Sequence, residues 1–287
     1  MFGKIWKKIK PVSTKKMLKE IEVLKMHIEA LSIANNKDKI FSIGNFFSNK
    51  DKHYGKTYRD VKMFLPMVGT DAIQTLIFQN LNFFSLKELE KLDVWLLKFI
   101  RTPFEKRVAF DVGANIGNHS IYWSTNNCFS KIYSFEPIRE TYDILTKNIQ
   151  INNLENKIIP YNLGIGEKES YAKIKVYSLN NIGANQIEVL ENNFEQSNIK
   201  IISLDEFGNK NAISNIDFIK IDVEGFEKQV LLGSKELIKR FKPLMLVEIF
   251  PEHFDVINEI MTSYGYVIVD KIGHADFLFI HRDKKND

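Results

Sequence analysis

The stretch VAFDVGANIGNHS, residues 108–120, constrains the fold more than any other part of the chain. Its apolar, β-prone start stops at Asp111, and a turn containing two glycines then leads into a segment that can begin a helix. A strand, a tight turn and a helix in this order are the first unit of a parallel α/β sheet. Because such sheets bind ligands at the carboxyl ends of their strands, this turn is a candidate binding loop.

From residue 107 onward, apolar runs typical of strands alternate with segments of helical periodicity. We predict strands at residues 107–111, 131–136, 157–162, 216–222, 243–249, 265–270 and 276–281. We predict the main helices at about 117–126, 138–152, 227–240 and 252–263. The alternation predicts an α/β fold, a doubly wound, mostly parallel, seven-stranded Rossmann-like sheet with right-handed crossovers.

The sequence before this domain predicts helices and a linker. We divide the chain into a helical extension and linker at 1–60, a helical lead-in at 61–106 and the α/β domain at 107–287. Residues 35–58, rich in Asn, Lys, Ser and Gly, are expected to be irregular. In the lead-in, residues 70–71 can cap one helix, and Ser85 with Glu88 can form a capping box for a second, at about 85–100. We expect these two helices to cap one edge of the domain.

Basic charge is concentrated in the extension. Residues 1–60 hold 14 Lys and Arg against 6 Asp and Glu, a net charge of +8, whereas the whole chain carries only +4. The rest of the chain is therefore mildly acidic, which gives no argument for nucleic-acid binding by the domain.

The extension contains two amphipathic patterns, and each leaves two interpretations open. Residues 1–10 place apolar side chains at i, i+3, i+4 and i+7 with lysines on the other face. Residues 1–12 could thus contact an anionic membrane surface, or pack on their own protein. Apolar positions in residues 17–31 step by 4, 3, 4 and 3, which favours either a homo-oligomer helix or a helix docked on the same chain.

Other features suggest a cytoplasmic protein. No apolar run approaches the ~18 residues of a membrane-spanning helix, and no secretory signal follows the basic start. The single cysteine, Cys128, cannot form an internal disulfide and suits a reducing compartment. We therefore expect a cytoplasmic protein, with peripheral placement at the inner membrane face as the alternative.

The turn does not fit a dinucleotide. The G-x-G-x-x-G fingerprint begun at Gly113 would need glycines where Asn115 and Asn118 stand, and a pyrophosphate requires close backbone approach at the first of these. Glu136, at the end of the next strand, can accept both hydroxyls of a ribose and repels phosphates. A nucleoside with an uncharged or positive tail fits these residues, and S-adenosylmethionine is the common one.

Six runs together resemble the FkbM family of S-adenosylmethionine-dependent methyltransferases, which has the class I methyltransferase fold. They are DVGANIGNHS, FEP at 135–137, YNLGIGEKES at 161–170, ISLDEF at 202–207, DFIKIDVEGFEKQVLLG at 217–233 and LMLVEI at 244–249. The resemblance covers about residues 108–281. It implies a cofactor site whose methionine and ribose side is lined by Asp111, Gly113, Asn115 and Gly117. It further implies that Glu136, followed by Pro137, holds the ribose diol and that Asn162 lies near the adenine, although Asn162 could also be a plain turn residue.

Methyl transfer to an alcohol needs a group that removes the hydroxyl proton, and the strand ends offer several. Asp222 is our first candidate for the base and Glu224 the second, unless both hold their loop through backbone amides. Glu248 ends the following strand, and His253 is the runner-up base because its ordinary pKa suits neutral pH. We expect His119 to pack beside the first helix.

Asp222, Glu224 and Glu248 could instead bind a divalent cation such as Mg²⁺, and no ligand spacing decides between a metal and a base; we favour the base. We expect the acceptor to be recognised by the polar segment 178–198, through Asn181, Asn185 and Gln186, unless this segment is a plain surface loop.

The sequence thus predicts an O-methyltransferase that acts on a hydroxyl of a glycan, such as a cell-surface polysaccharide or lipid-linked sugar, or of a similar metabolite. The alternatives are N-methylation of a small molecule and a cofactor-binding partner without activity. Asn115 disfavours an NAD-linked oxidoreductase.

Overall fold

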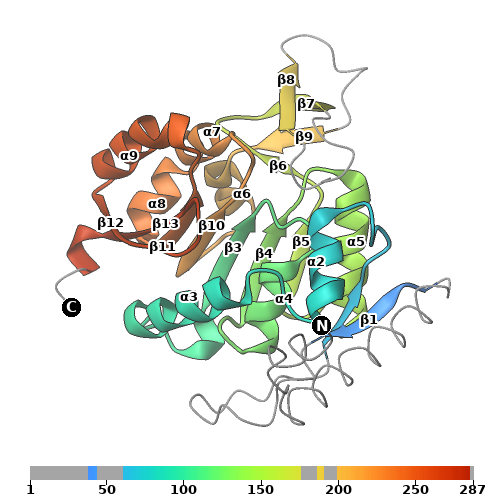
Figure 1. Ribbon diagram of the computed structural model, residues 1–287. Helices are drawn as coiled ribbons and strands as arrows, with labels where there is room; N and C mark the ends of the chain where they lie inside the picture. Colours follow the sequence, from blue (N-terminus) through green and yellow to red (C-terminus); the bar gives the residue numbers. More distant parts are fainter. Residues whose placement is uncertain (1–37, 44–60, 176–185, 191–198, 285–287) are drawn as a thin grey trace, which may run out of the picture.

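The computed structural model describes residues 38–43, 61–175, 186–190 and 199–284 (Figure 1). The basic helix and the heptad segment predicted in residues 1–31 lie outside these ranges, as does most of the segment 178–198. Among the described residues, we find no helix with the length and apolar character needed to cross a membrane.

A seven-stranded sheet forms the centre of the molecule, in the order β12-β13-β11-β10-β3-β4-β5. Its strands are β3 (Val108–Val112), β4 (Lys131–Phe135), β5 (Ile158–Tyr161), β10 (Phe218–Ile221), β11 (Leu244–Glu248), β12 (Tyr266–Lys271) and β13 (Asp276–His281). Neighbours from β5 to β11 pair in parallel, whereas β13 is antiparallel to both β11 and β12. This is the doubly wound order with one antiparallel strand inserted near an edge, and it confirms the predicted fold class.

Helices cover both faces of the sheet, and each face has its own apolar core (Figure 1). One face carries α2 (Ala72–Asn80), α3 (Leu86–Phe99), α4 (Asn118–Thr125) and α5 (Arg139–Ile151). The other carries α6 (Leu204–Lys210), α7 (Glu227–Leu232), α8 (Lys235–Phe241) and α9 (Phe254–Ser263). The central strand β10 is buried on both faces, which explains why FIKI lacks simple alternation.

Two predicted helices differ in detail. The helix predicted at 227–240 is divided into α7 and α8 at Gly233, where a Cβ would lie only 2.0 Å from the carbonyl oxygen of Gly166. Only glycine permits this close approach of two backbones. The helix predicted at 252–263 begins with the 3-10 turn Pro251–His253 and continues as α9.

The lead-in packs into the same core as the domain. Asp71 caps α2 as predicted, because its carboxylate accepts the backbone N–H of Gln74 at 2.8 Å. The capping box predicted at Ser85 is wrong: Ser85 makes no side-chain cap, and its φ of 53° is left-handed, whereas a capping residue normally has extended backbone. Residues 35–58 are not wholly irregular, because β1 (Ile40–Ile43) pairs with β2 (Val61–Phe64) and buries Phe41 against Phe78.

A second, four-stranded sheet stands beside the carboxyl ends of the central strands (Figure 1). It consists of β6 (Gly164–Ile165), β9 (Ile199–Ile202), β7 (Ser170–Lys175) and β8 (Gln186–Leu190). We did not predict this sheet: β8 lies within the segment 178–198, which we expected to recognise the acceptor or to be a surface loop. Short 3-10 turns complete the described chain at Phe104–Lys106 and Arg282–Lys284.

Candidate active site

The loop between β3 and α4 is shaped by backbone conformations that few side chains tolerate. Gly113 has a φ of +79°, and a Cβ there would lie 1.7 Å from the backbone oxygen of Asp222, so the loop after β3 and the loop after β10 touch. Asn115 and Gly117 are also left-handed, with φ of 49° and 92°. Gly117 then begins α4. The glycines at 113 and 117 are therefore required by the backbone itself.

Glu136 lies at the end of β4 and is 5% exposed. Its carboxylate accepts the backbone N–H of Asn115 and of Ile138, both at 2.9 Å. Burial nevertheless raises the pKa of Glu136 to about 7, against the effect of these two hydrogen bonds. Asn162 holds the same loop from β5, since its amide donates to the carbonyls of Glu136 and Pro137.

These loops enclose a narrow first cavity of about 90 Å³. The predicted cofactor residues that line it are Gly113, Asn115, Glu136 and Pro137, together with the base candidates Asp222 and Glu224. The remaining wall is mostly apolar, with Thr141 as its polar side chain and Ile73 contributed by α2. Asp111, Gly117 and Asn162 lie outside the lining: the first is buried beneath the loop, and the other two shape the backbone around the cavity.

A buried lysine that we did not predict as part of the site lies beneath it. Lys220, 2% exposed, places its Nζ 3.0 Å from Asp222 Oδ2 and 3.6 Å from Asp111 Oδ1. It also donates to the carbonyl of Gly113 at 3.3 Å. Ser120 donates to the other oxygen of Asp111 at 2.5 Å. A lysine inside an otherwise apolar buried strand was the signal in the sequence. The pairing of β10 with β3 explains it, because the register sets Lys220 opposite Asp111.

The pKa values of this group follow from burial and from opposite charge. Burial alone would lower the pKa of Lys220, but Asp222 and Asp111 together raise it above the ordinary value. Lys220 in turn lowers the pKa of Asp222 despite the burial that opposes this. Burial raises the pKa of Asp111, in spite of the attraction of Lys220.

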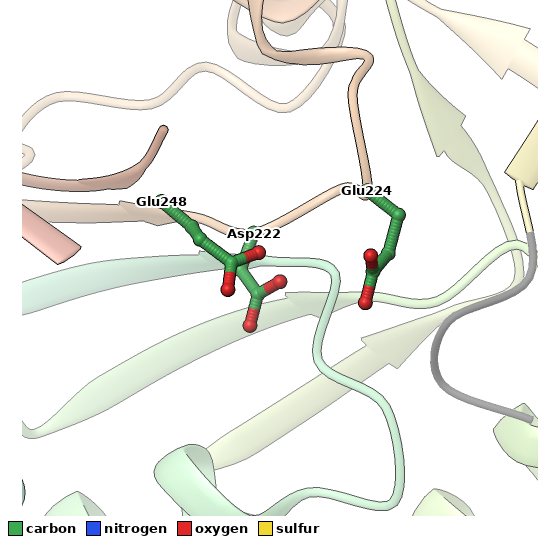
Figure 2. Close-up of side chains that lie close together, drawn as sticks. All are labelled: Asp222, Glu224 and Glu248. Carbon is green, nitrogen blue, oxygen red and sulfur yellow. The ribbon is translucent and has the colours of Figure 1, made fainter. Parts of the chain in front are cut away.

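Asp222, Glu224 and Glu248 gather at the ends of β10 and β11, as predicted (Figure 2). Each offers one carboxylate oxygen within 4.8 Å of the others. Burial, followed by the charge of Asp222, raises the pKa of Glu248 to about 9 and that of Glu224 to about 7. At neutral pH, Glu248 therefore keeps its proton beside an ionised Asp222. The three oxygens could hold a cation, as the sequence left open, but Lys220 already supplies a positive charge to Asp222.

A second cavity, of about 850 Å³, opens on the other side of Asp222. Its polar lining includes Glu88 from α3, His119 from α4, Glu248 and Asp276. Burial and the nearby Lys220 lower the pKa of His119 to about 3, so its imidazole is neutral. We expected His119 to pack beside the helix; it does contact Trp123, at 5.5 Å between ring centroids, and it also faces this cavity. Asp222 lines both cavities.

His253 lies apart from this arrangement. It lines a different cavity with Glu224 and Glu252, and its Nδ1 is 3.9 Å from Glu227 Oε2. It lines neither cavity that Asp222 borders. The geometry therefore favours Asp222 over His253 as the base.

The chain is similar to known methyltransferases. A family model described as the methyltransferase FkbM domain matches residues 111–268. The hexuronic acid methyltransferase AglP of Haloferax volcanii is 30% identical over 146 residues, which are 50% of this chain and 56% of that protein. Methyltransferase 1 of Beauveria bassiana is 22% identical over 171 residues, 53% of this chain and 62% of that protein. The chain thus spans little more than half the length of these curated relatives.

Among solved structures, the methyltransferase FkbM from Methylobacillus flagellatus is 20% identical, with a TM-score of 0.42 over 63% of this chain and 45% of that one. The METTL16 methyltransferase domain is 14% identical, with a TM-score of 0.45 over 69% of this chain and 68% of that one.

Proposed function

This chain belongs to the FkbM methyltransferase family, and we propose that it transfers a methyl group from S-adenosylmethionine to a hydroxyl of a glycan or a similar metabolite. That it is a methyltransferase follows from the family. The observation that carries the finer proposal is the place of Asp222, whose side chain borders both cavities. A cofactor in the first cavity and an acceptor in the second would meet at this carboxylate.

The first cavity has the chemistry to hold S-adenosylmethionine, the usual cofactor of this fold. Glu136 offers a buried carboxylate to the ribose hydroxyls. Thr141, 3% exposed, lines the same cavity, and its hydroxyl oxygen has no hydrogen-bond partner among the described residues. A buried hydroxyl without a partner is unfavourable, and a ligand would satisfy it. The carboxylates of Asp222 and Glu224 suit the positive sulfonium that supplies the methyl group.

The size of the first cavity sets a condition on binding. Ligand pockets commonly measure about 300–1,000 Å³, whereas this cavity measures about 90 Å³. The cavity therefore has to widen when the cofactor binds. Ile73 on α2 is the lead-in side chain in its wall. Closure of this wall after binding would exclude water from the site.

Asp222 is the proposed base. Lys220 keeps it ionised and fixes the orientation of its carboxylate by the contact at 3.0 Å. The neighbouring Glu248, which keeps its proton, adds no second negative charge. Asp222 would accept the proton of the acceptor hydroxyl, and Lys220 would act as a positioning residue. A well-placed base contributes about 10²–10⁴-fold to such a reaction.

The name of the relative from Haloferax volcanii, which describes methylation of a hexuronic acid, supports a sugar as the class of acceptor and not the charge of that sugar. The test is methyl transfer to a panel of glycans, with the product methyl located by NMR. We expect an O-methyl product and a loss of turnover of about 10²–10⁴-fold in Asp222→Asn, with Glu259→Gln, an exposed acid on α9, as the control. An N-methyl product, or full turnover in Asp222→Asn, would contradict the proposal.

A further inference from the structure

We propose that the second cavity binds the acceptor and selects it by charge: an amino-bearing sugar binds best, a neutral sugar less well and a uronate worst. This inference rests on the proposed function, because it assigns the acceptor to the cavity that Asp222 joins to the cofactor side.

Acidic side chains reach this cavity from four different elements. Glu88 comes from the first turn of α3, Asp222 follows β10, Glu248 ends β11 and Asp276 begins β13. The antiparallel register of β11 and β13 sets Glu248 directly opposite Asp276. Three of these acids therefore stand side by side at one edge of the sheet, and Glu88 approaches the same cavity from α3.

Among the described basic side chains at or beneath the cavity, Lys220 is the one paired with carboxylates. Lys220 is buried beneath Asp222 and shared with Asp111, so the three groups together do not make the floor positive. Lys271 lines the cavity with its Nζ over the ring of Phe277, 5.0 Å from the centroid. His119 also lines it and is neutral. The ring contact leaves the positive charge of Lys271 in place, and Glu248 keeps its proton at neutral pH. The excess of negative charge in the described lining therefore rests on Glu88, Asp222 and Asp276.

The carboxyl groups themselves report a negative environment. After burial, the main causes that raise the pKa of Glu248 to about 9 are the nearby acids Asp222, Glu224 and Asp276. The pKa of Asp276 is also raised, by burial and then by Asp222. A cavity in which the protein's own carboxyls resist ionisation would resist the carboxylate of a uronate for the same reason.

Aromatic rings complete the cavity and suit a cationic or neutral sugar. Phe254 and Phe277 lie 5.1 Å apart, and Phe84 and Phe250 also line the space. The faces of aromatic rings attract ammonium groups and present apolar surface. Acids and aromatic rings together therefore favour a ligand that has hydroxyl groups, an apolar ring face and an ammonium group.

The test uses three methyl glycosides that differ at one group: the glucosaminide, the glucoside and the glucuronide. Each is titrated into the full-length protein while the backbone amides of Gly273 and Ala275, which line the cavity, are followed by NMR. We expect dissociation constants to increase in that order, with the glucuronide at least tenfold weaker than the glucosaminide. Asp276→Asn and Glu88→Gln should each reduce the ratio of the glucuronide and glucosaminide dissociation constants by about fivefold, because each removes one negative charge from the lining. Glu259→Gln on α9 should leave the ratio unchanged.

Two results would overturn the inference: a glucuronide that binds as tightly as the glucosaminide, or titrations in which none of the three sugars shifts the lining amides. A parallel titration with S-adenosylmethionine separates this failure from that of the proposed function. If the cofactor binds and the sugar order is reversed, only the charge selection is wrong. If the cofactor does not bind, the proposed function fails, whatever the order of the sugars.

Discussion

Replacing Lys220 by methionine tests the electrostatic centre of the site. The substitution keeps a long apolar stem but removes the charge that lies 3.0 Å from Asp222 and 3.6 Å from Asp111. At an effective dielectric constant of about 20, each attraction is worth about 5 kcal/mol, and desolvation of the buried ammonium offsets several kcal/mol of the total. Removing one partner of a buried ion group typically costs about 3–5 kcal/mol. We expect Lys220→Met to lower the free energy of unfolding by this amount at pH 8.

The sign of the pH dependence follows from the pKa shifts. The pKa of Lys220 is raised from 10.5, so its contribution is fully present at pH 8 and would be lost only as the pH rises through the folded value. Without the cation, burial raises the pKa values of Asp111 and Asp222 in the folded variant. The folded variant then binds more protons than its unfolded chain at mildly acidic pH. Its deficit relative to the wild type should therefore shrink as the pH falls from 8 to 5.5.

The assay is urea unfolding of both proteins at pH 8 and pH 5.5, followed by tryptophan fluorescence. Lys235→Met, on the exposed start of α8, is the matched control and should change stability by less than about 0.5 kcal/mol. The double variant Lys220→Met with Asp222→Asn should recover part of the loss, since one uncompensated charge is removed. A deficit that is the same at both pH values, or a variant more stable than the wild type, would refute this reasoning.

Two further predictions follow from the cofactor side of the site. Gly113→Ala should destabilise the protein by about 2–5 kcal/mol in urea unfolding, because its Cβ would meet the Asp222 backbone at 1.7 Å and its φ is +79°. The control Gly69→Ala, with a φ of +91° and no atom within 4 Å of the added Cβ, should show only the backbone strain of about 1–2 kcal/mol. Equal losses of stability in the two variants would contradict the role of the close contact. The affinity for S-adenosylmethionine should weaken by about 30-fold from pH 8 to pH 5.5 in calorimetric titrations. The reason is that Glu136, with a pKa of about 7, must be ionised to accept hydrogen bonds from two ribose hydroxyls. An affinity that does not change with pH would argue against that role.

The fold could be predicted because its signals are local. Each strand of the central sheet is an apolar run of the right length, and Gly113 and Gly117 mark a turn whose backbone is left-handed at both glycines. The division of the helix at Gly233 was missed because its cause is the distant carbonyl of Gly166. The pairing of β7 with β8 was missed for a similar reason, because the partner strand decides it.

The site residues could be predicted where acids stand at strand ends. They could not be predicted where a residue's role depends on contact with residues distant in the sequence. Asp222, Glu224 and Glu248 converge as their positions after β10 and β11 imply. Lys220 reads as an ordinary strand residue until the register with β3 places it opposite Asp111. His119 on α4 and Asp276 at the start of β13 are far apart in the sequence, and only the fold brings both to the second cavity.

The most direct test of the account is calorimetric titration of the purified protein with S-adenosylmethionine, repeated with Glu136→Ala and with Glu140→Ala, an exposed acid four residues further along the chain. Two charge-assisted hydrogen bonds to the ribose are worth about 3–6 kcal/mol, so the account predicts a loss of at least about 100-fold in Glu136→Ala and little change in Glu140→Ala. NADH should not bind. Equal cofactor affinity in Glu136→Ala and the wild type, or binding of NADH in place of S-adenosylmethionine, would contradict it.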